Sequence, residues 1–212
     1  MKIQVLTSKN SWLFENKVLI KKGNKIWNKV NIITDYKKIN KKYDAVVMLS
    51  YYKILPDKFL NICKYNFVVH ESDLPKGRGF SPLYKQIQIG KKKITFSLFE
   101  CSKKMDQGKI YLKKNYYFKK TLIYDEIKVK QIECAKNLIE TFIKKNKKKK
   151  IFPTKQKGRA TYFGQFKSTD SQLNPKKSIL SQFNKMRIKN NNKFPSFFFI
   201  NNKKFILKLY KQ

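Results

Sequence analysis

One histidine stands at the end of an apolar run and opens a polar loop. His70 is the only histidine of the chain, and it follows Phe67-Val68-Val69. Two carboxylates, a hydroxyl, a proline and the turn Gly77-Arg78-Gly79 come directly after it. Imidazole changes its charge near neutral pH, and ligands of open α/β sheets bind just beyond the carboxyl ends of the strands. His70 is therefore a candidate acid–base group.

A second loop offers a carboxylate beside a turn glycine. Asp106 and Gly108 lie between two predicted strands, residues 94–99 and 110–117. A carboxylate that is hydrogen-bonded to an imidazole fixes its tautomer and stabilises its charged form. No serine or cysteine stands in a recognisable nucleophile elbow. The pair of His70 and Asp106 therefore suits removal of a proton from an external nucleophile better than covalent catalysis.

Other kinds of site find no support in the sequence. No Walker loop and no G-x-G-x-x-G motif is present, and one histidine with scattered acids gives no metal cluster. Cys63, Cys101 and Cys134 are odd in number and widely spaced, which suits neither a disulfide framework nor a zinc site. A reduced, cytoplasmic setting is the expectation. No signal peptide and no apolar stretch of the ~20 residues that a membrane span needs is visible, so no membrane partner is expected.

The net charge of +37 has a simple explanation in composition. Of 50 basic residues only Arg78, Arg159 and Arg187 are arginine, and Asn, Ile, Tyr and Phe are also abundant, which indicates a bias toward AT-rich codons. Where lysine is the default cation, a retained arginine indicates a need for its planar fork of donors. Arg78 therefore either binds an anionic ligand or braces the loop. The basic surface suits polyanions such as tRNA, a nucleotide-linked sugar or a polyglutamylated folate.

The pattern along the first 150 residues predicts a parallel sheet. Strands are expected at residues 2–6, 30–34, 45–49 and 67–70, with helices at 11–22 and 56–63 between them. This alternation is the signature of parallel strands covered on their faces by helices. A helix at 82–89, the strands at 94–99 and 110–117, and a long helix at 125–145 follow.

The chain after residue 150 reads as a second, smaller unit. Residues 144–150 are almost all lysine and predict a linker or a solvated helix end. A helix is expected near 175–186, and a hairpin of residues 194–200 and 205–209 around Asn201-Asn202, since asparagine tolerates positive φ. We therefore expect an α/β fold, a Rossmann-like mostly parallel sheet flanked by helices (1–150), with a small C-terminal α+β appendage (151–212).

These residues resemble the folate-dependent formyltransferase family. The string His70-Glu-Ser-Asp-Leu-Pro-Lys-Gly-Arg-Gly79 and the later Asp106-x-Gly108 match its motifs. The sequence of the His70 loop most resembles that of the sugar N-formyltransferases. The tail, with Gln182-Phe183-Asn184 and Phe194-Pro195, is also similar to that branch. The resemblance thus covers nearly the whole chain and implies the formyltransferase fold.

The resemblance implies an enzyme that moves a formyl group from 10-formyltetrahydrofolate to a primary amine. His70 would take the proton that the amine loses, with Asp106 orienting it; such help contributes ~10²–10⁴-fold. The positions matching the folate contacts are Ser72, Asp73, Leu74 and Pro75, and the loop from Phe99 to Asp106 matches the wall of the pterin pocket. Arg78 and Gly79 would bind the acceptor. No metal is implied.

One departure from the family pattern bears on activity. The family usually has asparagine two residues before the histidine, where it donates to the oxyanion, and Val68 stands there. Asn66 lies on the same strand face but ~13 Å from His70 along the strand, too far to substitute. Loss of one such donor costs ~10²–10³ in rate. Another donor acts here, or the enzyme is slow, or the chain is a folate-binding relative that no longer catalyses.

The acceptor has two alternatives. A nucleotide-linked amino sugar ranks first, and methionyl-tRNA second, because about 60 residues follow Lys150 whereas tRNA-type members carry a larger C-terminal barrel. Gln165-Phe166-Lys167, where the sugar-type tail often has arginines, weakens the inference about the substrate. Sugar-type members often dimerise, so a homodimer is among the assemblies that the resemblance allows.

Overall fold

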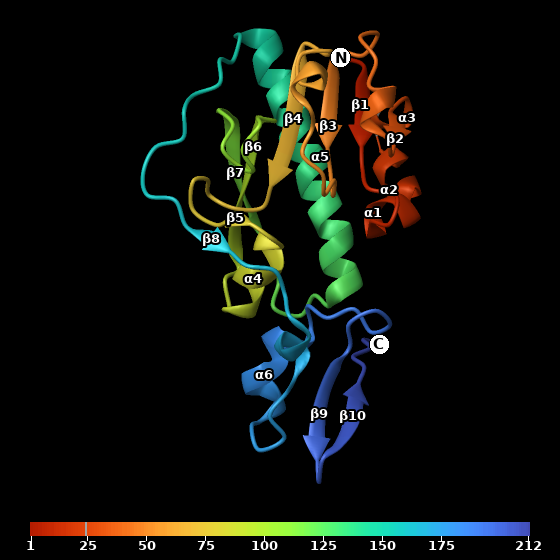
Figure 1. Cartoon of the computed structure of the whole chain (residues 1–212), viewed down its shortest axis with the longest axis vertical. Coiled ribbons are helices and arrows are strands. Elements are labelled where there is room, and N and C mark those ends of the chain that lie inside the picture. Colours follow the sequence, from red (N-terminus) through yellow and green to blue (C-terminus); the bar gives the residue numbers. More distant parts are fainter. Residues whose placement is uncertain (24) are drawn as a thin grey trace.

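A computed structural model describes residues 1–23 and 25–212 (Figure 1). Its strands are β1 (Ile3–Leu6), β2 (Asn31–Ile33), β3 (Ala45–Met48), β4 (Tyr65–His70), β5 (Arg78–Gly79), β6 (Lys93–Glu100), β7 (Ile110–Tyr117), β8 (Tyr162–Phe163), β9 (Ser196–Ile200) and β10 (Lys203–Leu207). Its α-helices are α1 (Trp12–Glu15), α2 (Lys17–Lys21), α3 (Lys25–Asn28), α4 (Pro82–Gln88), α5 (Tyr124–Lys148) and α6 (Ile179–Met186), and 3₁₀ turns are η1 (Tyr36–Lys38), η2 (Asp57–Phe59) and η3 (Ser168–Ser171).

The central sheet has six strands in the order β2-β1-β3-β4-β6-β7. The pairs β1–β2, β1–β3 and β3–β4 are parallel, whereas β6 runs antiparallel to β4 and to β7. The prediction of a mostly parallel α/β sheet is confirmed. Because β4 ends at His70, the histidine lies at the carboxyl edge of the parallel strands, where we expected it.

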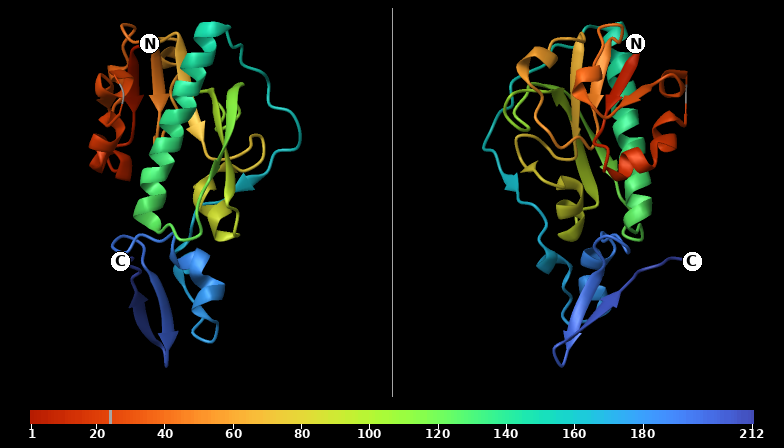
Figure 2. Two further views of the ribbon diagram at one scale, coloured as in Figure 1. Left: turned by 180° about the vertical axis from the view of Figure 1, so that it is seen from behind. Right: turned by 45° about the vertical axis from the view of Figure 1, so that its right-hand side comes forward.

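The two faces of the sheet are covered differently. Figure 2 shows α5 lying along one face, and buried side chains of α1, α2, α3 and α5 pack there with Phe67 and Val69 in the larger core. The opposite face carries Val46, Met48 and a partly buried Val68, and it is covered by η1, η2 and loops rather than by α-helices. The alternation of β4 thus directs Val68 and His70 to the thinner face, where a cavity has room to form.

Two predicted helices differ in the structure. The helix expected at 11–22 begins as predicted, since the Ser11 side chain accepts from the Phe14 N–H, but Asn16 leaves helical geometry and divides it into α1 and α2. The helix expected at 56–63 is only the turn η2. There the Leu60 carbonyl accepts a hydrogen bond of 2.5 Å from the side chain of Asn66 in β4. In a continuing helix, this carbonyl would accept from a backbone N–H of the next turn.

The last part of the chain forms a helix and a hairpin below the carboxyl edge of the sheet (Figure 1). The antiparallel pair β9–β10 turns through Asn201 and Asn202, both at positive φ, which confirms the predicted hairpin. The charged run is the last turn of α5 and the residues after it. The division at residue 150 stays a prediction. Within the described residues no helix is long and apolar enough to cross a membrane.

The loop that carries Asp106 returns to the sheet through a position where only glycine fits. A β-carbon on Gly108 would lie 1.7 Å from the Glu100 carbonyl oxygen, a backbone atom that cannot move aside without breaking β6–β7 pairing. Gly108 therefore fixes how closely this loop crosses the end of β6. The absence of a side chain there is a condition for placing Asp106 beside β4.

We predict that Gly108→Ala destabilises the fold, because overpacking a close contact costs about 1–3 kcal/mol, occasionally more. The free energy of unfolding from urea titration measures it. Gly164→Ala is the matched control, since nothing lies within 4 Å of a β-carbon there. Equal stabilities of the two variants would contradict the close-approach argument.

Candidate functional site

His70 is held by a backbone carbonyl on one side and faces a carboxylate on the other. The residue is buried, and Nε2 lies 2.8 Å from the Gly77 carbonyl oxygen. A carbonyl only accepts, so Nε2 carries a hydrogen and Nδ1 is the nitrogen that can take up a proton. The Asp106 Oδ1 lies 3.7 Å from Nδ1, within ion-pair range but beyond a hydrogen bond. Gly77 rather than Asp106 therefore fixes the tautomer, and the Asp106 carboxylate faces the Nδ1 side of the ring.

Asp106 is itself tied to the histidine loop. Its Oδ2 accepts a hydrogen bond of 2.8 Å from the Gly79 N–H, and its backbone has φ of +55°. Ser50 and Ser81 also have positive φ, and all three residues line one cavity with His70. Non-glycine residues held in this region cost free energy and cluster at functional sites. The three residues with strained backbone therefore line the same cavity as His70.

The His70 cavity, of about 270 Å³, is lined by the ends of β3 and β4 and by the loops that follow β3, β4 and β6. Its wall includes Met48, Val68, Phe99 and Met105 together with His70 and Asp106. The structure thus brings the two predicted catalytic residues together, and five residues of the predicted pterin wall beyond Phe99 also line the cavity: Cys101, Ser102, Lys104, Met105 and Asp106.

Asn66 is engaged elsewhere, as its distance from His70 required. Its amide donates to the Leu60 carbonyl and its Oδ1 accepts from the Cys101 N–H at 3.1 Å. Val68 therefore faces the cavity with no side-chain donor, and Asn66 cannot take that part. What Asn66 does instead is anchor the start of the Asp106 loop to β4.

The four residues predicted to contact folate, Ser72, Asp73, Leu74 and Pro75, belong to the loop after His70 and do not line the His70 cavity. Ser72 and Leu74 are buried, and Asp73 forms an ion pair of 2.6 Å with Lys113. In this structure these residues shape the loop that carries Gly77. Their contact with folate stays a prediction.

Arg78 and Gly79 also make contacts within the protein. The Arg78 guanidinium donates to Gln156 Oε1 at 2.7 Å and to the Tyr162 hydroxyl at 3.2 Å, and it does not line the His70 cavity. The Gly79 N–H is taken by Asp106. Of the two alternatives for Arg78, these contacts favour the brace. Binding of the acceptor by Arg78 and Gly79 stays a prediction.

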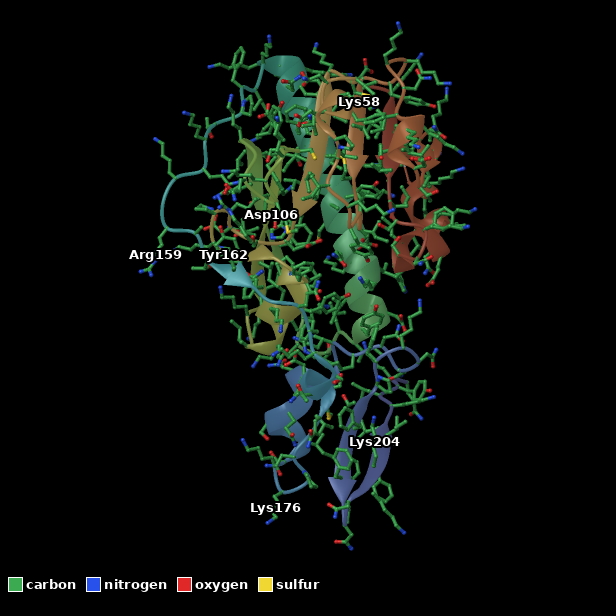
Figure 3. All side chains as sticks on the ribbon, viewed as in Figure 1. Lys58, Asp106, Arg159, Tyr162, Lys176 and Lys204 are labelled. Atoms are coloured by element: carbon green, nitrogen blue, oxygen red, sulfur yellow. The ribbon has the colours of Figure 1, made fainter. Side chains whose placement is uncertain are left out.

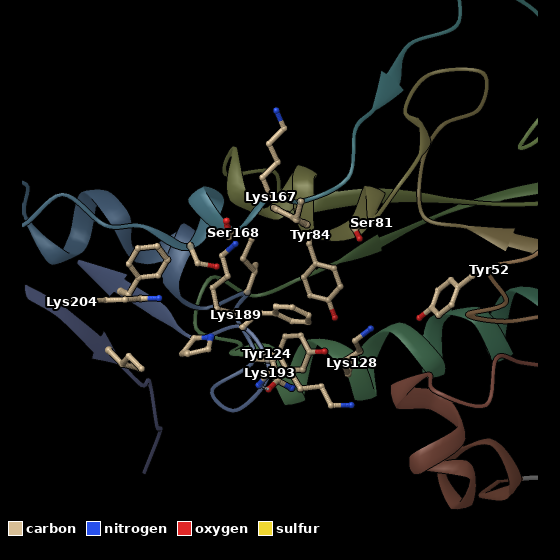
Figure 4. A pocket seen from close by; sticks show the side chains of 18 residues that line it. Tyr52, Ser81, Tyr84, Tyr124, Lys128, Lys167, Ser168, Lys189, Lys193 and Lys204 are labelled. Carbon is tan, nitrogen blue, oxygen red and sulfur yellow. Dashed lines mark hydrogen bonds between the residues drawn. The ribbon is translucent and has the colours of Figure 1, made fainter. Parts of the chain in front are cut away.

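A second cavity adjoins the first. It has a volume of about 520 Å³, is lined by residues of α4, of α5 and of the chain from residue 166 onward, and shares Tyr52, Ser81, Tyr84 and Lys128 with the His70 cavity (Figure 4). We call it the lysine cavity. Its lining includes five lysines and no carboxylate: Lys128, Lys167, Lys189, Lys193 and Lys204.

Of these lysines Lys189 is buried and Lys128 is half-buried. Burial lowers the pKa of Lys189 to about 8, and it also lowers the pKa of Lys128. The Lys189 ammonium lies over the Phe166 ring at 4.5 Å, and that of Lys128 over Tyr84 at 5.1 Å. Within residues 1–23 and 25–212 neither forms an ion pair; Asp170, which attracts Lys189, pairs with Lys85 instead. Buried lysines are normally paired, so this cavity suits an anion.

Sequence reasoning missed Lys128 and Lys189 because lysine is everywhere in this chain. A weak signal existed: Lys128 lies one turn after Tyr124 on α5, and Lys189 follows the buried Ile188. Neither pattern stands out among so many lysines. The three cysteines are free thiols, and the described residues contain no group of three or more His, Cys, Asp or Glu side chains that could hold a metal ion.

Burial of Lys189 predicts a pH-dependent stability. Its pKa is lower in the folded than in the unfolded state, so folding is penalised below pH 8 and the penalty is relieved as pH rises from about 8 to 10.5. At pH 7 the free energy of unfolding of Lys189→Met, from urea titration, should therefore exceed that of the parent by on the order of 2 kcal/mol. This difference in stability should shrink by pH 10. The exposed Lys176→Met is the control. A gap that stays constant with pH would contradict the argument.

Comparison with known proteins places this geometry in a family. The family model described as formyl transferase matches residues 35–143. Methionyl-tRNA formyltransferase of Thermotoga neapolitana is 30% identical over 146 residues, which cover 68% of this chain and 47% of that protein. The chain thus spans about half the length of this relative.

Two solved structures share the fold. Methionyl-tRNA formyltransferase from Clostridium thermocellum superposes with a TM-score of 0.74 at 21% identity, covering all of this chain and 94% of that one. An N-formyltransferase from Helicobacter canadensis, solved with folinic acid and dTDP-3-aminofucose, has a TM-score of 0.63 at 15% identity, covering 95% and 85%. The family model matches half of this chain, including β4, His70 and Asp106, and the chain therefore belongs to the formyl transferase family.

Proposed function

We propose that the protein transfers a formyl group from 10-formyltetrahydrofolate to the primary amine of a nucleotide-linked amino sugar. The observation that carries the proposal is the pair of adjoining cavities. One contains His70 beside Asp106, and the other contains the buried Lys189 and the half-buried Lys128, neither of which forms an ion pair within the described residues. Folate, which supplies the activated one-carbon group, and a phosphate-bearing amine would meet where the cavities adjoin.

The His70 cavity has the lining that a flat heterocycle needs. Val68, Phe99 and Met105 supply apolar surface, and the backbone of residues 101–106 supplies polar groups at the rim. Ligand sites in proteins are mostly apolar with a few placed polar groups. These residues would hold the pterin with the one-carbon group toward His70. The Helicobacter canadensis relative, whose structure contains folinic acid, supports this part of the proposal.

His70 then acts at Nδ1. Nε2–H stays on the Gly77 carbonyl, so Nδ1 accepts the proton that the attacking amine loses. Asp106 Oδ1, 3.7 Å away, stabilises the imidazolium that results. As the bond between the formyl carbon and the folate nitrogen breaks, the same proton passes from Nδ1 to that nitrogen, which leaves as tetrahydrofolate. Burial of both side chains excludes water that would compete with the amine for the formyl group.

The lysine cavity indicates the class of acceptor. Lys128 and Lys189 would pair with phosphate oxygens, and the exposed ring of Phe194 offers a surface on which a nucleobase stacks, an interaction worth ~1–3 kcal/mol. Figure 4 shows Lys128 and Lys189 pointing into the cavity from α5 and from the segment after α6, whereas Lys167 points away. A sugar between phosphate and His70 would pass Tyr84.

Methionyl-tRNA is the second candidate acceptor. The observation in its favour is the identity of the curated relatives, such as methionyl-tRNA formyltransferase of Thermotoga neapolitana. The lysine cavity and the basic surface, on which nitrogen-tipped side chains extend outward around much of the molecule (Figure 3), would then hold the acceptor end of the tRNA. The cytoplasmic location expected from the cysteines and the homodimer that the family resemblance allows both stay predictions.

The acceptor is tested by offering both classes of amine. We predict that the chain, given 10-formyltetrahydrofolate, formylates at least one of a panel of nucleotide-linked 3- and 4-amino sugars, detected by mass spectrometry of the sugar. Charged initiator tRNA is offered in parallel, and formyl-methionine as the only product would reverse the ranking. His70→Ala should lower kcat by roughly 10²–10⁴-fold. Asp106→Asn should lower kcat by a smaller factor. A His70→Ala variant as fast as the parent would refute the catalytic assignment.

Position 68 predicts a gain of function. A carboxamide there would face the cavity on the same strand face as His70 and could donate to the oxygen of the transferred group. We expect Val68→Asn to raise kcat at least about tenfold, since one such donor is worth ~10²–10³. Val68→Thr, similar in volume but without an amide, serves as control. No gain would mean that another donor already acts here.

A gain from an undetectable parental rate has a different meaning. It would favour the third alternative, a relative that holds folate without turnover. Prolonged incubation of the parent with the formyl donor and an acceptor distinguishes this alternative from a slow enzyme, because product accumulates only with the slow enzyme, whereas both would bind folinic acid.

A further inference from the structure

An extended segment between α5 and the C-terminal unit crosses both loops of the site. We call residues 154–163 the strap; it ends in β8, and Figure 3 labels Arg159 and Tyr162 along it. Thr154 pairs with Ile110 directly after the Asp106 loop, with hydrogen bonds of 2.8 and 2.9 Å. Further on, Thr161 Oγ1 accepts from the Gly77 N–H at 2.8 Å. The strap therefore contacts the His70 loop and the Asp106 loop in turn.

Gln156 is the side chain that joins the two loops. Its Nε2 donates to the carbonyls of Asp106 at 2.8 Å and Gly108 at 2.9 Å, and its Oε1 accepts from Arg78 Nη2 at 2.7 Å. All of its amide groups are thus used within the protein. The neighbours Lys155 and Lys157 are exposed, and Gln156 alone of the three is partly buried.

The strap lies so close to the histidine loop that the loop needs glycine. A β-carbon on Gly79 would lie 2.5 Å from the Phe163 carbonyl oxygen, and one on Gly77 would lie 2.7 Å from the Phe163 ring. Both glycines also have positive φ. The Gly-Arg-Gly turn is therefore fitted to the strap: two glycines allow the close approach, and the arginine between them bonds to Gln156.

Three hydrogen bonds hold the catalytic pair in place. His70 Nε2 is held by the carbonyl of Gly77, the Asp106 carboxylate by the N–H of Gly79, and the Asp106 backbone by Gln156. Asp106 has φ of +55°, a conformation that persists only where the surroundings over-determine it. The Gln156 amide is one of those determinants. Without it, the Asp106 carboxylate keeps its hydrogen bond from the Gly79 N–H, but the Asp106 backbone loses a partner and can shift the carboxylate relative to Nδ1.

We propose that Gln156 is a positioning residue that sets the separation of Asp106 from His70, with the strap as its support. The proposal rests on the proposed function for its effect on turnover, but its structural part stands on the hydrogen bonds alone. It assigns to the segment between the two units a part in the active site, although this segment contributes nothing to the lining of the His70 cavity.

The single histidine provides a direct readout. Gln156→Leu should move the imidazole NMR signals of His70 from their parental position toward those of Asp106→Asn. Gln156→Glu should do the same, because its carboxylate keeps an acceptor for Arg78 but places an oxygen against the carbonyls of Asp106 and Gly108. Lys155→Gln and Lys157→Gln are the matched neighbours and should leave the signals unchanged. Parental imidazole signals in both folded Gln156 variants would overturn the proposal.

Kinetics separates positioning from binding. For an acceptor that the parent formylates, both Gln156 variants should lose about 10–100-fold in kcat, the cost of an ~1 Å misplacement, with KM for the folate donor unchanged within about twofold. A rise in KM with unchanged kcat would overturn the proposal, since it would make Gln156 part of a binding surface. If the parent formylates nothing, the proposed function fails, while the imidazole signals still decide the part of Gln156.

Discussion

The site depends on one constraint: two groups from separate segments of the chain must be held within ion-pair distance at the edge of the sheet. His70 comes from the end of β4, and Asp106 from the loop between β6 and β7. Their side chains do not hydrogen-bond to each other, and the backbone around them does the holding, through the Gly77 carbonyl and the Gly79 N–H. Glycine is required where these loops approach other backbone, at positions 79 and 108. The geometry of the pair is therefore a property of the loops and of the strap that joins them.

The second feature is positive charge that the chain leaves uncompensated. Most lysines lie at the surface, where solvation satisfies them, but Lys189 is buried and pays a desolvation penalty that lowers its pKa. A fold does not keep such a group for its own stability. An anionic ligand in the lysine cavity would offset the penalty and would place its neighbouring amine toward the cavity that holds His70. The two features together support an amine acceptor that carries phosphate.

Much of this could be predicted from the sequence, because strand order and the motif loop are local signals. The apolar runs predicted β1, β3 and β4, the asparagine pair predicted the β9–β10 hairpin, and the two polar loops predicted the pair of His70 and Asp106. Contacts between residues far apart in the sequence could not be predicted from it. Gln156 is 50 residues from Asp106, and nothing in its neighbourhood along the chain indicates an inward-facing amide. The lysine cavity joins α5 to the C-terminal unit, and its lysines do not differ in sequence from those on the surface. The tautomer of His70 also depends on a carbonyl that no side-chain pattern reveals.

The most direct measurement is an NMR titration of the parent with folinic acid, observed at its one imidazole. The account predicts a saturable change in the His70 signals, because the pterin and the one-carbon group would lie in the cavity that this ring lines. The same titration of Asp106→Asn should give a different bound-state signal from the ring that has lost its carboxylate neighbour. Saturable binding that leaves the imidazole signals where they are, or no binding at all, would contradict the account.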